Sequence, residues 1–376
     1  MSKLRLILTA ACILLQMPAA WAQTVQTPIT AEADRDLASR LDLAFSRHYP
    51  ASQPGATIIV VKHGETVFRQ AYGMADMGKG VPMTPDMSLR IGSVTKQFTA
   101  TAILMLADQG KLALSDDIRK FLPDFPTEGK TITVEHLLTH TSGILSYTSM
   151  RDFGARIALD LTVAEMIDHF KDQPRQFEPG QRYSYSNSNY FLLGAIIEKV
   201  SGMPYADFLA TAIFSPLGMH DTAAEGHERS ARRHVAGYDR SPGGFVPARV
   251  IDMSQPYAAG ALVSTVDDLA RWDAAVSSGK LLRQSTWDKA FLPHVLGDGS
   301  ATKYGYGWEI GKLLGTTVIS HSGAIDGFNA AVLRIPAQGL YIAVLSNIGR
   351  GADAESVAVQ AAAILMGPSS KRAGRF

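Results

Sequence analysis

The sequence has a single cysteine, Cys12, among 376 residues. This residue lies in an apolar segment near the N-terminus that has the features of a cleaved signal, so the processed chain would contain no thiol. A chain without thiols forms no disulfide, no thiolate metal site and no cysteine nucleophile. Any covalent catalysis must therefore use another side chain.

Net charge is also lacking, because 36 Lys and Arg residues balance 35 Asp and Glu residues. Such a balance creates no overall field that would attract nucleic acid or an anionic membrane, so we predict neither as a partner. The apolar run from Leu6 to Leu15 is shorter than the roughly 20 residues that a membrane helix needs. We therefore predict no stable membrane span.

Residues 1–22 instead have the pattern of a signal peptide. Lys3 and Arg5 precede the apolar run, and Ala20-Trp21-Ala22 is a typical cleavage site. We therefore predict an exported protein, either periplasmic or secreted. The length of the remaining chain suggests two lobes, at about 150 residues per domain, and is compatible with a monomer.

Hydrophobic periodicity indicates strands towards both ends of the chain and helices between them. The predicted strands are 56–61, 66–71, 88–91, 306–310, 316–320, 328–335 and 340–346. The main predicted helices are 37–48, 163–171, 190–200, 266–277 and 354–366, with capping boxes at Thr162/Glu165 and Thr265/Asp268. We further place Pro204 in the first turn of another helix.

These elements predict an α/β (α+β) fold, with an antiparallel sheet flanked by helices and an inserted all-helical lobe. Residues 30–115 and 295–368 would form a discontinuous α/β lobe, and residues 116–294 a mainly helical one. The active site would lie in the cleft between the two lobes.

Ser93 and Lys96 are the first candidates for chemistry. A serine and a lysine three residues apart share one face of a helix, where the lysine can act as a base if burial lowers its pKa. The same spacing recurs at Ser277/Lys280 and Ser300/Lys303, but next to glycines. Only Ser93 begins a long apolar helix, and a capping serine with a surface lysine is the simpler alternative.

Two further segments are polar and adjoin apolar elements. Tyr185-Ser186-Asn187 lies in a loop rich in phenols and amides, which suits proton transfer and carbonyl binding, although a capping loop is the alternative. His321-Ser322-Gly323-Ala324 follows an apolar strand. There, Gly323 would let a substrate approach, and the next backbone N–H could bind an oxyanion.

The three groups together resemble the motifs of the serine β-lactamase and penicillin-binding protein superfamily. The order is typical of its class C β-lactamase, D-Ala-D-Ala carboxypeptidase and esterase branch, whose second motif is Tyr-x-Asn. Further matching segments are 137–143, 177–180 and 260–272, and the resemblance spans roughly residues 35 to 365. It implies a β-lactamase/transpeptidase-like fold.

The resemblance also implies roles for the site residues. Ser93 would be the acylated nucleophile, Lys96 its partner and Tyr185 the proton shuttle, with Lys96 and Tyr185 both open as the base. Asn187 would bind the substrate carbonyl, and the N–H groups of Ser93 and Ala324 would form the oxyanion hole. His321, Ser322, Gly323 and Ala324 would line the substrate site.

His321 departs from the lysine that many β-lactamases have at this position. A largely neutral histidine would bind a substrate carboxylate weakly or in a pH-dependent way, so we favour a D-Ala-D-Ala carboxypeptidase, another peptidase or an esterase over a class C-like β-lactamase. A non-catalytic penicillin- or peptide-binding protein is the second alternative. A metal site at His136 and His140 is disfavoured, because no glutamate lies between them.

The sequence therefore predicts an exported serine hydrolase that acts through an acyl-enzyme on Ser93. We expect a small-molecule or short-peptide substrate, with neither a metal nor an organic cofactor.

Overall fold

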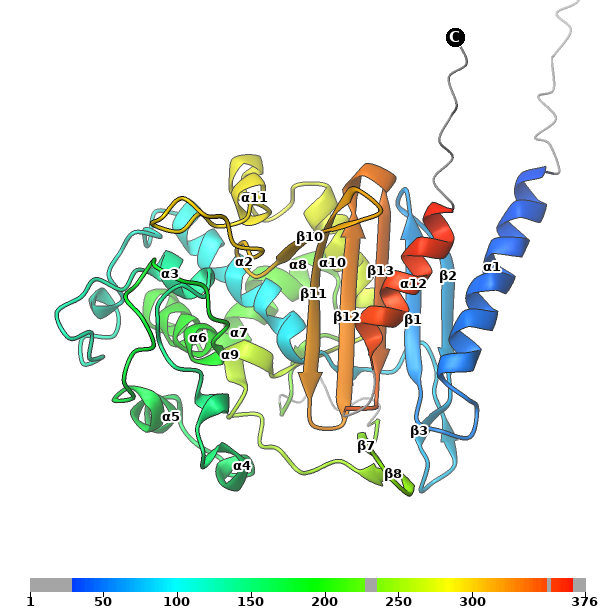
Figure 1. Ribbon diagram of the computed structural model, residues 1–376, viewed down its shortest axis with the longest axis horizontal. Helices are drawn as coiled ribbons and strands as arrows, with labels where there is room; N and C mark the ends of the chain where they lie inside the picture. The colour runs from blue at the N-terminus through cyan, green and yellow to red at the C-terminus, as the bar shows by residue number, and fades with distance from the viewer. Residues whose placement is uncertain (1–28, 227–234, 350–352, 368–376) are drawn as a thin grey trace, which may run out of the picture.

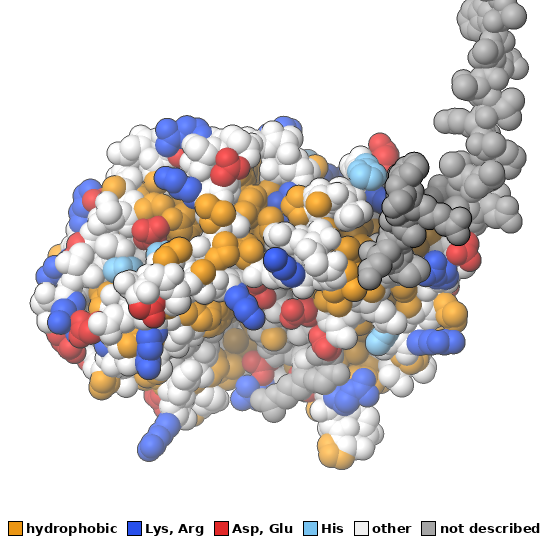
Figure 2. All heavy atoms as spheres, turned by 45° about the horizontal axis from the view of Figure 1, so that its top comes forward, with side chains coloured by type: hydrophobic (Ala, Val, Ile, Leu, Met, Phe, Trp, Pro, Cys, Tyr) orange, Lys and Arg blue, Asp and Glu red, His pale blue; other side chains and the backbone are white. Residues whose placement is uncertain are grey.

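The computed structural model describes residues 29–226, 235–349 and 353–367 (Figure 1). The predicted signal peptide, residues 1–22, lies outside these ranges. Within them, no helix combines the length and the apolarity that a membrane crossing requires. Lys and Arg side chains are interspersed with Asp and Glu side chains over the face drawn in Figure 2, as the balanced composition leads one to expect.

A six-stranded antiparallel sheet has the order β10-β11-β12-β13-β1-β2. Its strands are β1 (Ala56–Lys62), β2 (Glu65–Tyr72), β10 (Glu309–Leu313), β11 (Thr316–Ile325), β12 (Phe328–Ile335) and β13 (Leu340–Ser346). β1 pairs with β13 from Ala56↔Ser346 to Lys62↔Leu340, so the two ends of the chain meet inside one sheet. The predicted antiparallel sheet built from both ends is confirmed.

Helices cover both faces of this sheet. On one face, α1 (Ile29–His48) and α12 (Ala354–Met366) lie side by side (Figure 1) and bury a separate core that includes Phe45, Ile58 and Val344. On the other face, α10 (Val266–Ser277) packs against β1 and β13. α10 therefore covers the sheet although it lies within residues 116–294, which we assigned to the helical lobe.

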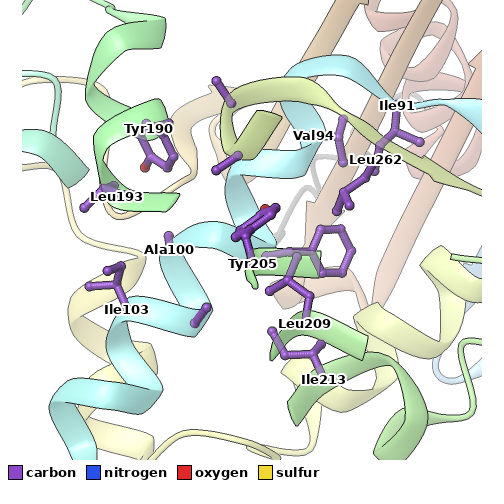
Figure 3. Close-up of a cluster of buried hydrophobic side chains, with 14 of the residues drawn as sticks. Ile91, Val94, Ala100, Ile103, Tyr190, Leu193, Tyr205, Leu209, Ile213 and Leu262 are labelled. Atoms are coloured by element: carbon purple, nitrogen blue, oxygen red, sulfur yellow. The ribbon is translucent and has the colours of Figure 1, made fainter. Parts of the chain in front are cut away.

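α2 (Thr95–Asp108) is the central helix of the remaining part of the molecule, and it packs against α6 (Asn187–Ser201) and α9 (Tyr257–Gly260). All its residues from Thr95 to Leu104 are buried, because neighbouring elements surround it. Figure 3 shows part of this core, with Ala100 and Ile103 beside Tyr190 and Leu193. The other helices and helical turns are η1 (Gly92–Val94), η2 (Ile118–Lys120), α3 (Val134–Leu138), η3 (Tyr147–Ser149), α4 (Phe153–Arg156), α5 (Val163–Phe170), α7 (Tyr205–Leu209), η4 (Ala210–Phe214), α8 (Ser215–Leu217), α11 (Gln284–Ala290) and η6 (Pro336–Gln338).

The inserted segment is not entirely helical, which corrects one prediction. Its strands β6 (Ala223–Ala224) and β9 (Leu262–Ser264) form a small sheet with β5 (Leu89–Arg90). β7 (Tyr238–Ser241) and β8 (Gly244–Pro247) form a hairpin, and the short strands β3 (Met74–Asp76) and β4 (Val81–Pro82) pair outside the insertion. β5 lies within the predicted strand 88–91, but the other strands of two to four residues were not predicted, because so short a segment carries little periodicity.

Helix capping differs from the prediction at α10 and at α7 (Tyr205–Leu209), but not at α5. Thr162 and Glu165 form the expected reciprocal capping box, and Thr265 accepts a hydrogen bond from the Asp268 N–H. The Asp268 carboxylate, however, accepts from the Asp221 N–H and the Thr222 hydroxyl instead of completing a second box. Pro204 is the N-cap of α7 and precedes its first turn.

The most consequential difference lies in β11. We predicted that this strand ends at residue 320, but it continues to Ile325. Its neighbour β10 pairs with it only as far as Ser320, so the edge from His321 to Ile325 has no strand partner on that side. The helical turn η1, which contains Ser93, packs against β11.

Candidate active site

Ser93 lies in η1, immediately before α2. Gly92 has a φ of 50°, and a Cβ atom there would lie 3.0 Å from the Ala324 nitrogen. A glycine is therefore needed for both the backbone conformation and the close approach to β11. The turn leaves Ser93 partly exposed at the N-terminal end of a buried helix.

The Lys96 side chain is fully buried and points at Ser93. Its Nζ lies 2.9 Å from Ser93 Oγ, 2.8 Å from Asn187 Oδ1 and 2.8 Å from the Ala259 carbonyl oxygen. Burial lowers the pKa of Lys96 well below its usual value. A neutral amine has two N–H groups, which here donate hydrogen bonds to the Asn187 and Ala259 oxygens. Its lone pair is then directed at the Ser93 hydroxyl.

Tyr185 approaches the same hydroxyl from the opposite loop. Its phenol forms a side-chain hydrogen bond with Ser93, and its ring centroid lies 4.9 Å from Lys96 Nζ. Burial raises the pKa of Tyr185 well above 10, although the bond to Ser93 acts in the opposite direction. The phenol is therefore a proton donor at neutral pH.

Asn187 is the first residue of α6 and does not act as a helix cap. Its amide oxygen accepts from Lys96, and its Nδ2 donates to the Thr148 hydroxyl at 3.2 Å. These two bonds orient the side chain towards the space beside Ser93.

The edge of β11 completes the site. A Cβ atom at Gly323 would lie 2.1 Å from the Ile91 carbonyl oxygen and 3.0 Å from the Ser93 nitrogen. A glycine at position 323 therefore allows the turn that carries Ser93 to approach β11 closely. The close contact brings the Ser93 and Ala324 backbone N–H groups onto adjoining segments, as an oxyanion hole requires.

Both ring nitrogens of His321, a residue that we predicted to bind a substrate carboxylate only weakly or in a pH-dependent way, have partners in the structure. Its Nδ1 donates to the Ser322 carbonyl at 2.7 Å, so Nε2 accepts from the Tyr304 hydroxyl at 2.8 Å. The side chain is only 2% exposed, and its burial lowers the pKa of His321 to about 3. Both ring nitrogens are occupied, so the imidazole is a neutral structural group behind the site.

His136 and His140 do not share a helix face, because α3 ends at Leu138 and His140 has a φ of 58°. His136 Nδ1 accepts from the Thr133 N–H at the start of α3. Among the described residues, no group of three or more His, Cys, Asp or Glu side chains is arranged to hold a metal ion.

His140 has a positioning role that its residue type and spacing did not predict. Its carbonyl accepts from the Ser184 N–H at 3.0 Å, and its Nδ1 accepts from the Ser186 N–H at 3.1 Å. The two residues that flank Tyr185 are thus both held by His140, whose ring centroid lies 4.2 Å from the Tyr185 ring. The match of 137–143 to the family pattern was the only signal in the sequence.

A cavity of about 130 Å³ adjoins Ser93. One side is formed by Asn187 and by η3 with Thr148, and another by α9 and the end of β11. The lining residues are Gly92, Ser93, Tyr147, Thr148, Phe153, Asn187, Ile251, Pro256, Ala259, Gly260, Ala324, Ile325 and Asp326. Ser93, Asn187 and Ala324 therefore face one space, in which a carbonyl group can be bound and attacked.

Known proteins are similar to this chain in sequence. The beta-lactamase family model matches residues 44–366. Penicillin-binding protein 4* of Bacillus subtilis is 31% identical over 82% of this chain and 72% of its own length. A D-aminopeptidase of Gluconobacter oxydans is 30% identical over 87% of this chain, which spans 62% of that relative.

Solved structures agree with the sequence relatives. An octameric penicillin-binding protein homologue from Pyrococcus abyssi has a TM-score of 0.78 at 30% identity, over 88% of this chain and 77% of that one. The D-amino acid amidase of Ochrobactrum anthropi, complexed with L-phenylalanine amide, has a TM-score of 0.75 at 30% identity, over 88% and 96% of the two chains. These matches confirm the predicted fold class and family resemblance. The chain therefore belongs to the beta-lactamase family and is a serine hydrolase of that family.

Proposed function

We propose that this enzyme hydrolyses amide or ester bonds of D-amino-acid derivatives through an acyl-enzyme on Ser93. The observation that carries the proposal is the environment of Lys96. In the described structure this buried lysine contacts the Ser93 hydroxyl and two hydrogen-bond acceptors, the Asn187 amide oxygen and the Ala259 carbonyl oxygen. It is thereby prepared to accept the Ser93 proton.

The geometry supports a sequence of proton transfers. Lys96 takes the proton as Ser93 Oγ forms a bond to the substrate carbonyl carbon, and the carbonyl oxygen becomes an oxyanion bound by the N–H groups of Ser93 and Ala324. Tyr185 donates its proton to the leaving amine or alcohol as the C–N or C–O bond breaks, and Lys96 returns a proton to Tyr185. In the second half, water loses a proton to Lys96 as its oxygen bonds to the acyl carbon. The bond from that carbon to Ser93 Oγ then breaks, Oγ regains a proton from the Lys96/Tyr185 pair, and the acid is released.

The substrate class is supported by the relatives. A D-aminopeptidase and a D-amino acid amidase are both about 30% identical to this chain over most of its length. D-Ala-D-Ala carboxypeptidase, general esterase and class C-like β-lactamase activity are the competing functions. We also propose that the enzyme is exported to the periplasm or secreted, on the basis of the signal-peptide pattern in residues 1–22.

Mass spectrometry after incubation with a fluorophosphonate, a penicillin and a p-nitrophenyl ester tests the proposal. We expect an adduct on Ser93 and ester turnover, both absent from Ser93→Ala. Ser300→Ala is the matched control, because Ser300 has the same spacing to a lysine but lies in an exposed turn. Unchanged turnover in Ser93→Ala would refute the mechanism, and the absence of adduct and turnover with every probe would favour a binding protein.

A further inference from the structure

The cavity beside Ser93 contains one ionic side chain among its lining residues, the carboxylate of Asp326. The remaining walls are apolar, hydroxyl or amide groups and backbone, and the lining includes no Lys or Arg. Lys96 lies behind this lining, fully buried, and His321 is occupied at both nitrogens. The described cavity therefore lacks a cation for a substrate carboxylate and offers an anion instead.

Asp326 is well placed to contact the acyl part of a substrate. It follows β11 directly, in the turn to β12, and is two residues beyond Ala324, which we assign to the oxyanion hole. Two residues along a strand span about 7 Å. This separation suits a cationic group on the carbon next to a carbonyl whose oxygen is held at Ala324.

The carboxylate also retains an acceptor for a ligand. Arg249 makes two contacts with Asp326, from Nε and from Nη2, and both reach Oδ1 at 2.9 Å. No described residue hydrogen-bonds to Oδ2. The Asp326 side chain is 12% exposed and that of Arg249 is 49% exposed, so the carboxylate is the inner member of the pair.

We infer that Asp326 is a specificity residue that binds the ammonium group of the acyl moiety, so that the enzyme prefers D-aminoacyl amides with a free amine. This inference rests on the proposed function, since it names the substrate group recognised beside Ser93. It predicts discrimination against acyl groups whose nitrogen is acylated, and against substrates that require a cation for a carboxylate.

The test compares kcat/KM for D-alanine p-nitroanilide with that for N-acetyl-D-alanine p-nitroanilide, which has no ammonium group. The wild-type enzyme should prefer the free amine, and Asp326→Asn should lower the ratio of the two values about 10- to 100-fold, the range of a lost hydrogen bond to a charged group. A ratio near one in the wild type, or an unchanged ratio in Asp326→Asn, overturns the inference.

Arg249→Ala is the matched control, because it breaks the same ion pair but leaves the carboxylate in the cavity. It should keep or increase the preference for the free amine. If Arg249→Ala loses the preference as fully as Asp326→Asn does, the pair acts only by holding the β11–β12 turn, and the inference is wrong.

The pH dependence provides an independent readout. An α-amino group has a pKa of about 8, so the wild-type preference should decline between about pH 7 and pH 9.5 as the ammonium group is lost. The other ionisable groups around the site are Lys96, Tyr147, Tyr185 and Arg249. Their titration changes kcat/KM for both anilides alike, so its effect cancels in the ratio of the two values. A preference that persists undiminished at pH 9.5 contradicts recognition of an ammonium group.

The outcomes also separate this inference from the proposed function. Ser93-dependent hydrolysis of a p-nitrophenyl ester without turnover of either anilide overturns the inference and leaves the acyl-enzyme mechanism in place. Absence of any Ser93-dependent adduct or turnover overturns both.

Discussion

Replacing His140 with alanine should lower both stability and activity, although Ser93, Lys96 and Tyr185 themselves remain unchanged. The ring is fully buried, and its Nδ1 is the acceptor for the Ser186 N–H. Losing that acceptor leaves a buried donor unpaired, at a cost of about 1–3 kcal/mol. The lost ring contacts with Tyr185 and Tyr304 add about 1 kcal/mol. Alanine in a left-handed conformation costs about 1 kcal/mol more than a residue that tolerates it.

The expected loss in unfolding free energy is therefore about 3–5 kcal/mol, measurable by urea denaturation. Activity should fall by a separate route, because the loop on both sides of Tyr185 is held by His140. A displacement of the phenol by about 1 Å would lower kcat about 100-fold. KM should change little, since His140 is absent from the cavity lining.

His140→Asn is the conservative variant. The Oδ1 atom of asparagine can take the place of Nδ1 as the acceptor for Ser186, and asparagine tolerates a positive φ. It should regain most of the lost stability and most of kcat, with the wild-type pH profile. The reasoning is refuted if kcat for the ester in His140→Ala stays within twofold of the wild type, or if His140→Asn is impaired as severely as His140→Ala.

Three further predictions follow from the geometry. Gly323→Ala would place a Cβ atom 2.1 Å from the Ile91 carbonyl oxygen, so ester kcat/KM should fall at least ~100-fold. The control is Gly311→Ala on β10, where a Cβ atom meets nothing within 4 Å, and it should leave kcat/KM unchanged. Burial raises the pKa of Glu309 to about 7 and favours its protonated form, so Glu309→Gln should raise Tm at pH 8 and leave it nearly unchanged at pH 4, below both the folded and the unfolded pKa. An equal change at both pH values would contradict the titration of this carboxyl. Because the pKa of His321 is about 3 in the folded protein and about 6.5 in the unfolded chain, protons bind the unfolded state preferentially between these values. The unfolding free energy should fall as pH drops from 6.5 towards 3, and a slope that is equally steep in His321→Gln would show that other groups cause it.

Much of the fold was predictable because its main elements are local and periodic. The runs at 56–61, 328–335 and 340–346 alternate or are continuously apolar, and each became a strand with nearly the expected bounds. The short strand β5 was predicted at 88–91, but the other short strands were missed. The true end of β11 was also missed, since its last five residues lack a strand partner on one side and carry no apolar pattern.

For the site, the sequence alone determined which chemistry is available. Its single cysteine, Cys12, lies in the predicted signal peptide, and the spacing of Ser93 and Lys96 places both side chains on one face of a helical segment. The order of the three motifs indicated the family. These properties depend on residue type and on separation along the chain, which are visible in one dimension.

Only the tertiary structure decided the states and directions of these groups. The neutral Lys96 depends on burial by α6 and α9, and the occupied imidazole of His321 depends on Tyr304, seventeen residues away. The need for glycine at position 323 comes from the approach of Ile91, more than two hundred residues earlier. Desolvation, hydrogen-bond partners and close contacts between distant segments arise only when the chain is packed, and they determine which of the candidate side chains can react.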